Sequence, residues 1–420
     1  MNIVITRGCT GGSVAAIPAK AAAHRAFIAA ALSARKVDIR LGDAEVSQDI
    51  AATLRCLEQL GARIVDRGGG IRGCSPAPVP QKPVLDCGES GSTLRFLLPV
   101  AAALGVAARF TGTGRLPERP LSELICTLKA HGIGFSGDKL PFRISGKLSG
   151  GHFELPGNVS SQYISGLLFA LYAGGIPGEI ALTTRLESSR YVDMTVAMLR
   201  TFGAEIERSA GAWRIAGRSG RAVPECIAVE GDWSNAAAFL VCGALSRPVT
   251  VSGLDMNSLQ PDRAIVDILR DFGAEVKIDG DRITAAPGAL RAATVDVAET
   301  PDLLPVLAIM AAGAPGTSRL VNAARLRLKE SDRLNSTAQL LSAIGAQVEE
   351  LPDALEITGG VPLRGGTVES CNDHRLVMAA AAAASLGALP LAINGAGAIN
   401  KSQPGFFSDY AKIGGQFHAV

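Results

Sequence analysis

One short pattern of apolar and polar residues recurs along the whole chain. An amphipathic segment ends in an apolar residue, a glycine follows, and a strand-like alternation comes next, as in LRTFGAEIE and LRDFGAEVK. The pattern occurs six times, with its glycines at Gly61, Gly132, Gly203, Gly273, Gly345 and Gly414. Successive glycines are separated by 71, 71, 70, 72 and 69 residues. The 420 residues therefore read as six tandem units of about 70 residues each.

Each unit is predicted to contain an amphipathic helix followed by a strand hairpin. In residues 261–273, apolar side chains fall at i, i+3, i+4 and i+7, which is the spacing of one helix face. Gly273 is predicted to end this helix, because glycine adopts the left-handed conformation without strain. The hairpin follows, with Asp279 and Gly280 at its turn.

A second set of six helices is predicted between the amphipathic ones. These segments are apolar nearly all round, so we expect them to be buried. They are residues 24–34, 91–105, 160–174, 234–245, 302–314 and 373–387. Ser234 and Asn235 are interpreted as helix caps. Capping does not explain Arg25, Arg95 and Arg375, because a cation is unfavourable near a helix N-terminus. Their placement is explained if an anion lies between the helix N-terminus and the arginine.

Six units indicate an α/β (α+β) fold of two globular domains, each made of three repeated βαβαββ-type units with buried parallel helices. The last unit lacks one strand, and residues 2–6 (NIVIT) form a spare strand that we expect to complete it. The predicted domains are residues 16–226, and residues 1–15 with 227–420. The chain then crosses between them twice, near residues 11–16 and near residue 225 in the loop 217–226. Two crossings predict a hinge, and a hinge between anion-attracting faces predicts a cleft that closes on substrate.

Composition and charge exclude several function classes. There are 41 basic and 39 acidic residues with no basic block, which argues against a nucleic-acid or membrane-surface partner. The N-terminus lacks a signal-peptide pattern, and the longest apolar run, near residues 376–391, is shorter than the ~20 residues of a membrane span. The eight cysteines show no CxxC pair or zinc spacing. These observations predict a cytoplasmic protein with reduced thiols, no metal and no cofactor.

Several short motifs carry candidate chemistry because they combine cations, hydroxyls and carboxylates. They are PAKAAAHR (18–25), ESGSTLR (89–95), LPERP (116–120), VSSQ (159–162), SSRY (188–191), KESDR (329–333), NDHR (372–375) and Lys401. In this order the motifs resemble those of the enolpyruvyl transferases, most closely the EPSP synthase branch, from Pro18 to Phe407. The resemblance implies the repeated two-domain fold described as an inside-out α/β barrel or prism.

The resemblance also implies a reaction. The enolpyruvyl (1-carboxyvinyl) group of phosphoenolpyruvate passes to the 5-hydroxyl of 3-phosphoshikimate, and phosphate is released, on the shikimate pathway to chorismate and the aromatic amino acids. The catalytic residues implied are Lys20, Asp302, Glu330 and Lys401. Those implied for phosphoenolpyruvate are Lys20, Gly91, Arg119, Gln162, Arg333, Arg375 and Lys401. Those implied for 3-phosphoshikimate are Lys20, Ala21, Arg25, Ser160, Ser161, Gln162, Ser188, Tyr191, Asp302 and Lys329.

Two anionic substrates and an addition–elimination reaction explain these residue types. Several cations are needed to bring the anions together, a base is needed at the hydroxyl, and an acid is needed at C3 of phosphoenolpyruvate. The resemblance implies Asp302 at the hydroxyl and Glu330 at C3, with Lys20 assisting proton movement and Arg95 in support. General acid–base help of this kind contributes roughly 100- to 10,000-fold to the rate. The enzyme is expected to act as a monomer.

Three positions depart from the family pattern. Ala21 and Ala23 replace serines, and Arg190 replaces the usual proline. A serine hydroxyl can donate a hydrogen bond to an acceptor carboxylate, whereas alanine cannot. Two alternatives therefore remain: an enolpyruvyl transferase with another phosphorylated acceptor, and a non-catalytic anion-binding homologue. The relative that uses a UDP-sugar carries a cysteine where residues 112–120 have none, and intact Asp302, Glu330 and Lys401 favour catalysis.

Overall fold

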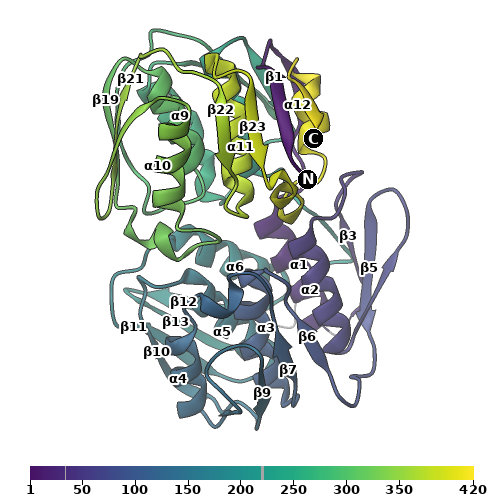
Figure 1. The fold of residues 1–420 in the computed structure, drawn as a ribbon. Coiled ribbons are helices and arrows are strands. Elements are labelled where there is room, and N and C mark those ends of the chain that lie inside the picture. Colours follow the sequence, from purple (N-terminus) through teal and green to yellow (C-terminus); the bar gives the residue numbers. More distant parts are fainter. Residues whose placement is uncertain (34, 219–221) are drawn as a thin grey trace. The chain divides into compact units, whose positions relative to one another are not determined.

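The computed structural model describes residues 1–33, 35–218 and 222–420 (Figure 1). Its contacts divide the chain into two compact units, Lys20–Val229 on one side and Met1–Ala19 with Glu230–Val420 on the other. The divisions fall at 19/20 and 229/230, where the sequence analysis placed them at 15/16 and 226/227. Residue 34, at the end of the predicted helix 24–34, and residues 219–221, in the predicted loop 217–226, lie outside the described residues.

In its described residues, the unit Lys20–Val229 contains three buried helices, three amphipathic helices and three four-stranded sheets. The buried helices are α1 (Lys20–Leu32), α3 (Gly91–Leu104) and α5 (Ser161–Gly174), and the amphipathic ones are α2 (Gln48–Gln59), α4 (Ser122–Ala130) and α6 (Ser189–Thr201). The sheets have the orders β14-β3-β5-β4, β6-β7-β9-β8 and β10-β11-β13-β12. Their strands are β3 (Val37–Arg40), β4 (Ala62–Asp66), β5 (Ile71–Pro76), β6 (Val84–Asp86), β7 (Arg109–Thr111), β8 (Gly134–Phe135), β9 (Phe142–Ser145), β10 (Gly151–Leu155), β11 (Gly178–Leu182), β12 (Ala204–Ser209), β13 (Ala212–Arg218) and β14 (Cys226–Ala228).

The other unit repeats this plan. Its buried helices are α7 (Trp233–Leu245), α9 (Leu304–Gly313) and α11 (His374–Ala383), and its amphipathic helices are α8 (Ile265–Asp271), α10 (Arg333–Ala343) and α12 (Phe406–Lys412). The sheet orders are β16-β17-β15-β2, β18-β19-β21-β20 and β22-β23-β1-β24. The strands are β1 (Ile3–Arg7), β2 (Gly12–Ala15), β15 (Val249–Ser252), β16 (Glu275–Asp279), β17 (Arg282–Ala286), β18 (Thr294–Asp296), β19 (Gly316–Val321), β20 (Gln347–Glu350), β21 (Leu355–Gly359), β22 (Gly366–Glu369), β23 (Leu391–Asn394) and β24 (Gln416–Ala419).

The N-terminal strand completes the last sheet. β1 lies between β23 and β24, antiparallel to both, with Val4 opposite Ala392 on one side and His418 on the other. This confirms the prediction drawn from the missing strand of the sixth unit. The two segments predicted to cross between domains contain strands: β2 pairs in parallel with β15, and β14 pairs in parallel with β3. That these segments act as hinges stays a prediction.

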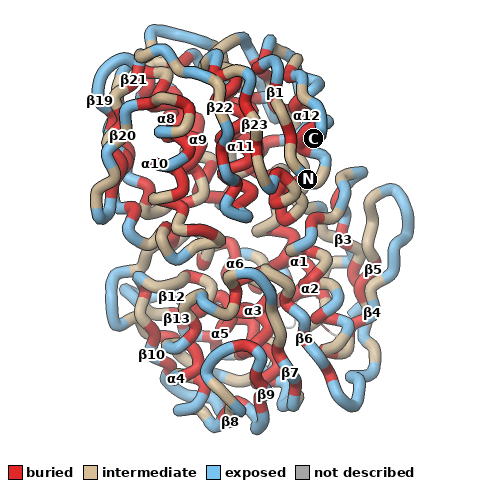
Figure 2. The backbone as a smooth tube through the Cα atoms, in the orientation of Figure 1, coloured by how far each residue is buried: buried red, intermediate tan, exposed pale blue. Residues whose placement is uncertain are grey.

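The six repeated glycines all have the left-handed backbone that the sequence predicts. Their φ angles are 92, 92, 84, 86, 83 and 88° in chain order. In each unit the alanine-rich helices supply much of the buried core (Figure 2). Gly166 of α5 shows why small residues are needed there, because a Cβ atom on it would collide with the carbonyl oxygen of Arg95 in α3. The scarcity of aromatic residues thus follows from close helix packing.

Two details of the helix starts differ from the prediction. Ser234 and Asn235 are not caps, because α7 begins at Trp233 and its cap is Asp232. The Asp232 side chain accepts a 2.7 Å hydrogen bond from the backbone N–H of Asn235. Asp302 does not begin its helix either. It lies in the turn before Leu304, where α9 starts with Pro305 in its first turn, a position at which the missing N–H of proline costs nothing.

No helix in the described part of the chain is long and apolar enough to cross a membrane. The eight cysteines all carry free thiols.

Candidate active site

Lys20 opens α1 and is held by a carboxylate of the next helix. Its Nζ donates to Oδ2 of Asp49 at 2.9 Å, and both side chains are mostly buried, at 18% and 16% exposure. Asp49 lies in the first turn of α2, one residue after the first residue of that helix. This pairing could not be predicted from the sequence, since an acidic residue in a first helical turn is ordinary.

Arg25 is buried among neutral acceptors. Its Nε donates to the Thr195 hydroxyl at 2.8 Å, and its Nη atoms donate to the carbonyls of Ala21 and Tyr191 at 2.8 and 2.7 Å. The guanidinium also lies 5.2 Å from the ring centroid of Phe96. Burial lowers the pKa of Arg25 to about 10, so the group is still charged at neutral pH. None of these contacts cancels its charge, which suits a residue that must attract an anion.

The start of α3 is bordered by two arginines. A Cβ atom built on Gly91 would lie 2.8 Å from Nη1 of Arg119 and 2.8 Å from Nη1 of Arg95, so only glycine leaves room for both guanidinium groups. Arg95 donates to Gln162 Oε1 at 2.9 Å, and the Gln162 amide donates to Ser92 at 2.9 Å. The structure thus brings together the predicted residues Gly91, Arg119 and Gln162 at a helix N-terminus, an arrangement that attracts anions.

The predicted phosphate-binding hydroxyls lie at the starts of α5 and α6. Ser160 caps α5, and its side chain accepts a 3.3 Å hydrogen bond from the backbone N–H of Gln162. Ser161 is the first residue of that helix and is buried. Ser188 precedes α6 with φ of 55°, in the left-handed region, and Tyr191 lies in the first turn of α6.

A buried ion-pair cluster surrounds Arg333 in the other unit. This side chain, only 1% exposed, donates to Asp373 Oδ2 at 3.0 Å, to Asp302 Oδ1 at 2.8 Å and to Glu330 Oε2 at 2.9 Å. Burial alone would lower the pKa of Arg333, but the charges of Asp373, Asp302 and Glu330 raise it above its usual value. Asp373 was part of a sequence motif but had no assigned role; it caps α11 and is 0% exposed.

Arg375 connects this cluster to α7. Its Nη2 donates to Asp302 Oδ2 at 3.3 Å, and its Nη1 donates to the side-chain oxygen of Asn235 at 2.9 Å. Burial alone would raise the pKa of Asp302, but Arg375, Arg333 and Lys329 bring it well below its usual value. Asp302 is therefore a carboxylate at neutral pH, and its side chain keeps 25% exposure while Arg333 and Arg375 are almost fully buried.

Lys329 and Lys401 add two further cations to the same unit. Burial lowers the pKa of Lys329 to about 8, although the carboxylates of Asp302 and Glu330 oppose the shift. Lys401 Nζ donates to the backbone carbonyl of Asn372 at 2.6 Å. Asn372 has a left-handed backbone, with φ of 56°, which turns this carbonyl at the start of the NDHR motif.

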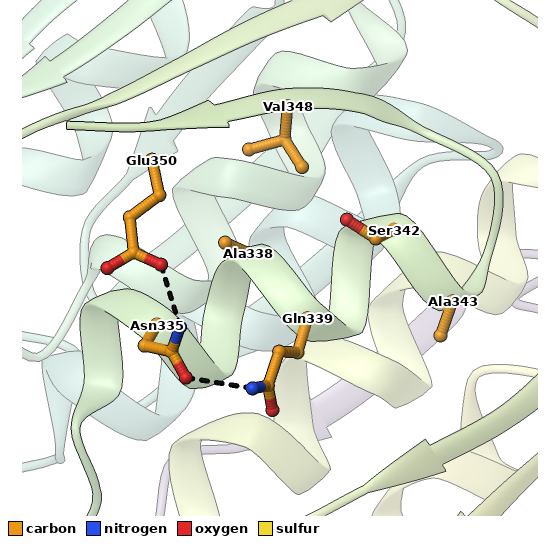
Figure 3. Close-up of a pocket in the computed structure, with 7 residues that line it drawn as sticks. All are labelled: Asn335, Ala338, Gln339, Ser342, Ala343, Val348 and Glu350. Carbon is orange, nitrogen blue, oxygen red and sulfur yellow. Dashed lines mark hydrogen bonds between the residues drawn. The ribbon is translucent and has the colours of Figure 1, made fainter.

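A groove of about 600 Å³ lies over α10 and β20 (Figure 3). Its polar lining is a chain of amides, in which Gln339 donates to Asn335 and Asn335 donates to Glu350, each at 2.8 Å. Glu350 also accepts a 2.5 Å hydrogen bond from Arg327, which pairs with Asp332 as well. The groove residues include none of those predicted for substrate. Glu350 connects them through Arg327 to Asp332, in the loop that carries Lys329 to Arg333.

Comparisons with known proteins agree with this geometry. The sequence profile of a family described as EPSP synthase (3-phosphoshikimate 1-carboxyvinyltransferase) matches residues 8–410. The chain belongs to the EPSP synthase family. It is 43% identical over 411 residues to the 3-phosphoshikimate 1-carboxyvinyltransferase of Clostridium kluyveri, covering 96% of this chain and 95% of that one. The corresponding protein of Methanocorpusculum labreanum is 38% identical, with 99% of each chain covered.

A solved EPSP synthase from Acinetobacter baumannii has the same fold over 100% of both chains, with a TM-score of 0.79 and 25% identity. The predicted family and the predicted fold class are thus confirmed.

In this member of the EPSP synthase family, the predicted site residues lie in two groups, one in each unit. Sequence reasoning missed the roles of three residues that hold these groups in place: Asp49, Asn235 and Asp373. The sequence suggests Asn235 only as a helix cap and places Asp373 in the NDHR motif without pairing either residue with an arginine, and Asp49 is ordinary in a first helical turn. Among the described residues, no set of three or more His, Cys, Asp or Glu side chains is placed to hold a metal ion.

Proposed function

We propose that this protein transfers the enolpyruvyl group of phosphoenolpyruvate to the 5-hydroxyl of 3-phosphoshikimate and releases phosphate. The observation that carries the proposal is family membership over nearly the whole chain, together with relatives of this name at 36–43% identity. The charged groups of both units support it, because the two substrates are multiply anionic. The alternatives of another phosphorylated acceptor and of a non-catalytic homologue are not favoured, because these relatives are all named 3-phosphoshikimate 1-carboxyvinyltransferase.

In the unit Lys20–Val229, the proposed ligand contacts follow the chemistry of each cluster. Gly91, Arg119 and Gln162 bind phosphoenolpyruvate at the start of α3, where backbone amides and guanidinium groups point toward an anion. For 3-phosphoshikimate, the proposed contacts are Lys20, Ala21, Arg25, Ser160, Ser161, Gln162, Ser188 and Tyr191. Lys20 also contacts phosphoenolpyruvate and assists proton movement.

In the other unit, the proposed groups are those that move protons. Asp302, kept as a carboxylate by its cationic neighbours, accepts the proton of the acceptor hydroxyl as the hydroxyl oxygen attacks C2 of phosphoenolpyruvate. Glu330, in its protonated form, donates a proton to C3 in the same step. The resulting tetrahedral intermediate then loses phosphate by C–O cleavage and returns a C3 proton to Glu330, which forms the C=C bond of the enolpyruvyl group. Arg333, Arg375 and Lys401 bind phosphoenolpyruvate, and Lys329 binds the acceptor. Lys401 also supports departure of the phosphate.

The proposal includes a cytoplasmic enzyme that acts as a monomer on two small molecules, without nucleic acid, membrane, metal or cofactor. Size-exclusion chromatography with light scattering tests the monomer, and assays with and without a metal chelator test the absence of a metal.

The direct test is release of inorganic phosphate from phosphoenolpyruvate by the full chain, with and without 3-phosphoshikimate. We expect release only when the acceptor is present, together with formation of 5-enolpyruvylshikimate 3-phosphate detected by mass spectrometry. Folded protein that releases no phosphate in an acceptor-dependent way would overturn the proposed function. Shikimate without its phosphate is the matched control, and it should be a poor substrate because Ser160 and Ser161 then lack their ligand.

A further inference from the structure

Asp262 is a buried carboxyl group to which the proposed mechanism gives no role. It lies in the 3₁₀ turn Pro261–Ala264, just before α8, and its exposure is 0%. Its Oδ2 accepts a short hydrogen bond from the hydroxyl of Ser234. Its Oδ1 is buried and has no hydrogen-bond partner among the described residues. A buried carboxylate in this position is costly, whereas a protonated carboxyl is tolerated.

Two consecutive residues of α7 link the Asp262 carboxyl group to Arg375. Ser234, which contacts Asp262, and Asn235, which accepts from Arg375, are consecutive residues in the first turn of α7. A change of charge on Asp262 therefore acts on the environment of Arg375 through a short, rigid path. Asp302, the proposed base, shares Arg375 as its ion-pair partner.

The charged groups around Asp262 come from several elements. Asp302 in the turn before α9 and Asp232 at the cap of α7 raise its pKa, whereas Arg375 of α11 lowers it. On its own 3₁₀ turn the charged neighbour is Arg263, and on α8 it is Asp267, whose side chain is 76% exposed and pairs with Arg270. Neither of these two is among the groups that shift the pKa of Asp262, for which burial is the largest cause and the charge of Asp302 the next.

Together these effects raise the pKa of Asp262 into the neutral range. Burial, followed by the charge of Asp302, raises the pKa of Asp262 to about 7, and the Ser234 hydroxyl and Arg375 limit the rise. The group therefore gains or loses its charge near neutral pH. Lys329, in the same unit, has its pKa lowered to about 8 by burial.

We propose that Asp262 is a positioning residue whose proton frees the charge of Arg375 for an anionic substrate. The inference rests on the proposed function and concerns the phosphoenolpyruvate carboxylate or phosphate. With Asp262 protonated, Arg375 faces the carboxylates of Asp302 and Asp232. With Asp262 ionised, a third negative charge lies near the Arg375 guanidinium and weakens its attraction for the incoming anion, so phosphoenolpyruvate binds less well.

The test is the pH dependence of kcat/KM for phosphoenolpyruvate at saturating 3-phosphoshikimate, because this ratio reports ionisations of the enzyme before phosphoenolpyruvate binds. In the wild type we expect kcat/KM to fall in two steps as the pH rises, one near the pKa of Asp262 and one near that of Lys329. Asp262→Asn keeps the shape and cannot ionise, so the first step should vanish and the second remain. One pH unit above the first step, the variant should retain about tenfold more of its plateau value than the wild type.

Two further variants separate this role from a structural one. Asp267→Asn removes an exposed carboxylate five residues away and should leave the profile unchanged. Ser234→Ala removes the hydrogen bond that limits the pKa of Asp262, so the first step should move to higher pH, and this variant carries the test if Asp262→Asn does not fold.

A two-step profile that is identical in wild type, Asp262→Asn and Ser234→Ala would overturn the inference while leaving the proposed function intact. Wild-type protein with no acceptor-dependent phosphate release at any pH would instead overturn the proposed function.

Discussion

Replacing Arg333 with methionine should destabilise the unit that contains the buried ion-pair cluster. Methionine has a comparable length and no charge, so the change removes the guanidinium while filling much of its space. The three carboxylates that Arg333 contacts, Asp302, Glu330 and Asp373, then lose their common partner. Asp373 is fully buried and cannot recover the loss by contact with water.

The expected cost follows from this geometry. Removing one partner of a buried ion pair costs about 3–5 kcal/mol, because the remaining charge is left desolvated. The loss should depend on pH. The pKa of Asp302 is lowered in the folded state, so its pairing stabilises the protein above the pKa of the unfolded chain, and this contribution disappears as pH falls. The difference in the free energy of unfolding between wild type and Arg333→Met should therefore be largest near neutral pH and smaller at acidic pH.

The chain contains two tryptophans, one in each unit, which gives a selective assay. Trp233 lies at the start of α7 in the same unit as Arg333 and is 0% exposed, and Trp213 lies in β13 of the other unit. In a Trp213→Phe background, urea unfolding followed by fluorescence reports only the unit that holds the cluster. The free energy of unfolding comes from the midpoint and the slope of the transition.

A surface pair supplies the control. Arg319 pairs with Glu356 across neighbouring strands at 2.8 Å, with exposures of 50% and 31%. Arg319→Met should cost no more than about 1 kcal/mol, as exposed ion pairs do. If Arg333→Met costs as little as Arg319→Met near neutral pH, or if its cost is equal at acidic pH, the reasoning about desolvated carboxylates is wrong.

Three further changes test the proposed substrate contacts. Glu330→Gln keeps the shape but removes the proton donor, so turnover should fall at least about a hundredfold while substrate binding measured by calorimetry changes little; near-normal turnover would remove Glu330 from this role. Gly91→Ala pushes the guanidinium groups of Arg95 and Arg119 away from the start of α3, so the KM for phosphoenolpyruvate should rise roughly tenfold or more with little change in thermal stability. Ala21→Ser supplies a hydroxyl for the acceptor carboxylate and should lower the KM for 3-phosphoshikimate; an unchanged KM would place that contact elsewhere.

Most of the fold could be predicted from local patterns. Helix and strand periods, the repeated glycines and the 70-residue spacing are properties of neighbouring residues, and local geometry enforces them wherever they occur. The six glycines illustrate this, since each needs a left-handed backbone that follows from the helix ending before it. The place of the spare N-terminal strand was predictable for a related reason, because the sixth unit lacks a strand that the repeated pattern requires.

The candidate site was predictable in its residue types and motifs, but its partners were not. Asp49 holds Lys20, Asn235 holds Arg375, and Asp373 holds Arg333, across separations of 29, 140 and 40 residues. Each of these polar side chains is ordinary in its local sequence, and only burial beside a cation makes it important.

The sequence by itself determined the six repeats, the helix ends, the joining of the first strand to the last unit, and the motifs that resemble one enzyme family. These depend on short-range geometry and on residue type. The tertiary structure alone decided which carboxylates share Arg333, why Asp302 remains ionised, and why Asp262 titrates near neutral pH. Such properties depend on desolvation and on charges brought together from distant parts of the chain, and neither can be computed from residues read in order.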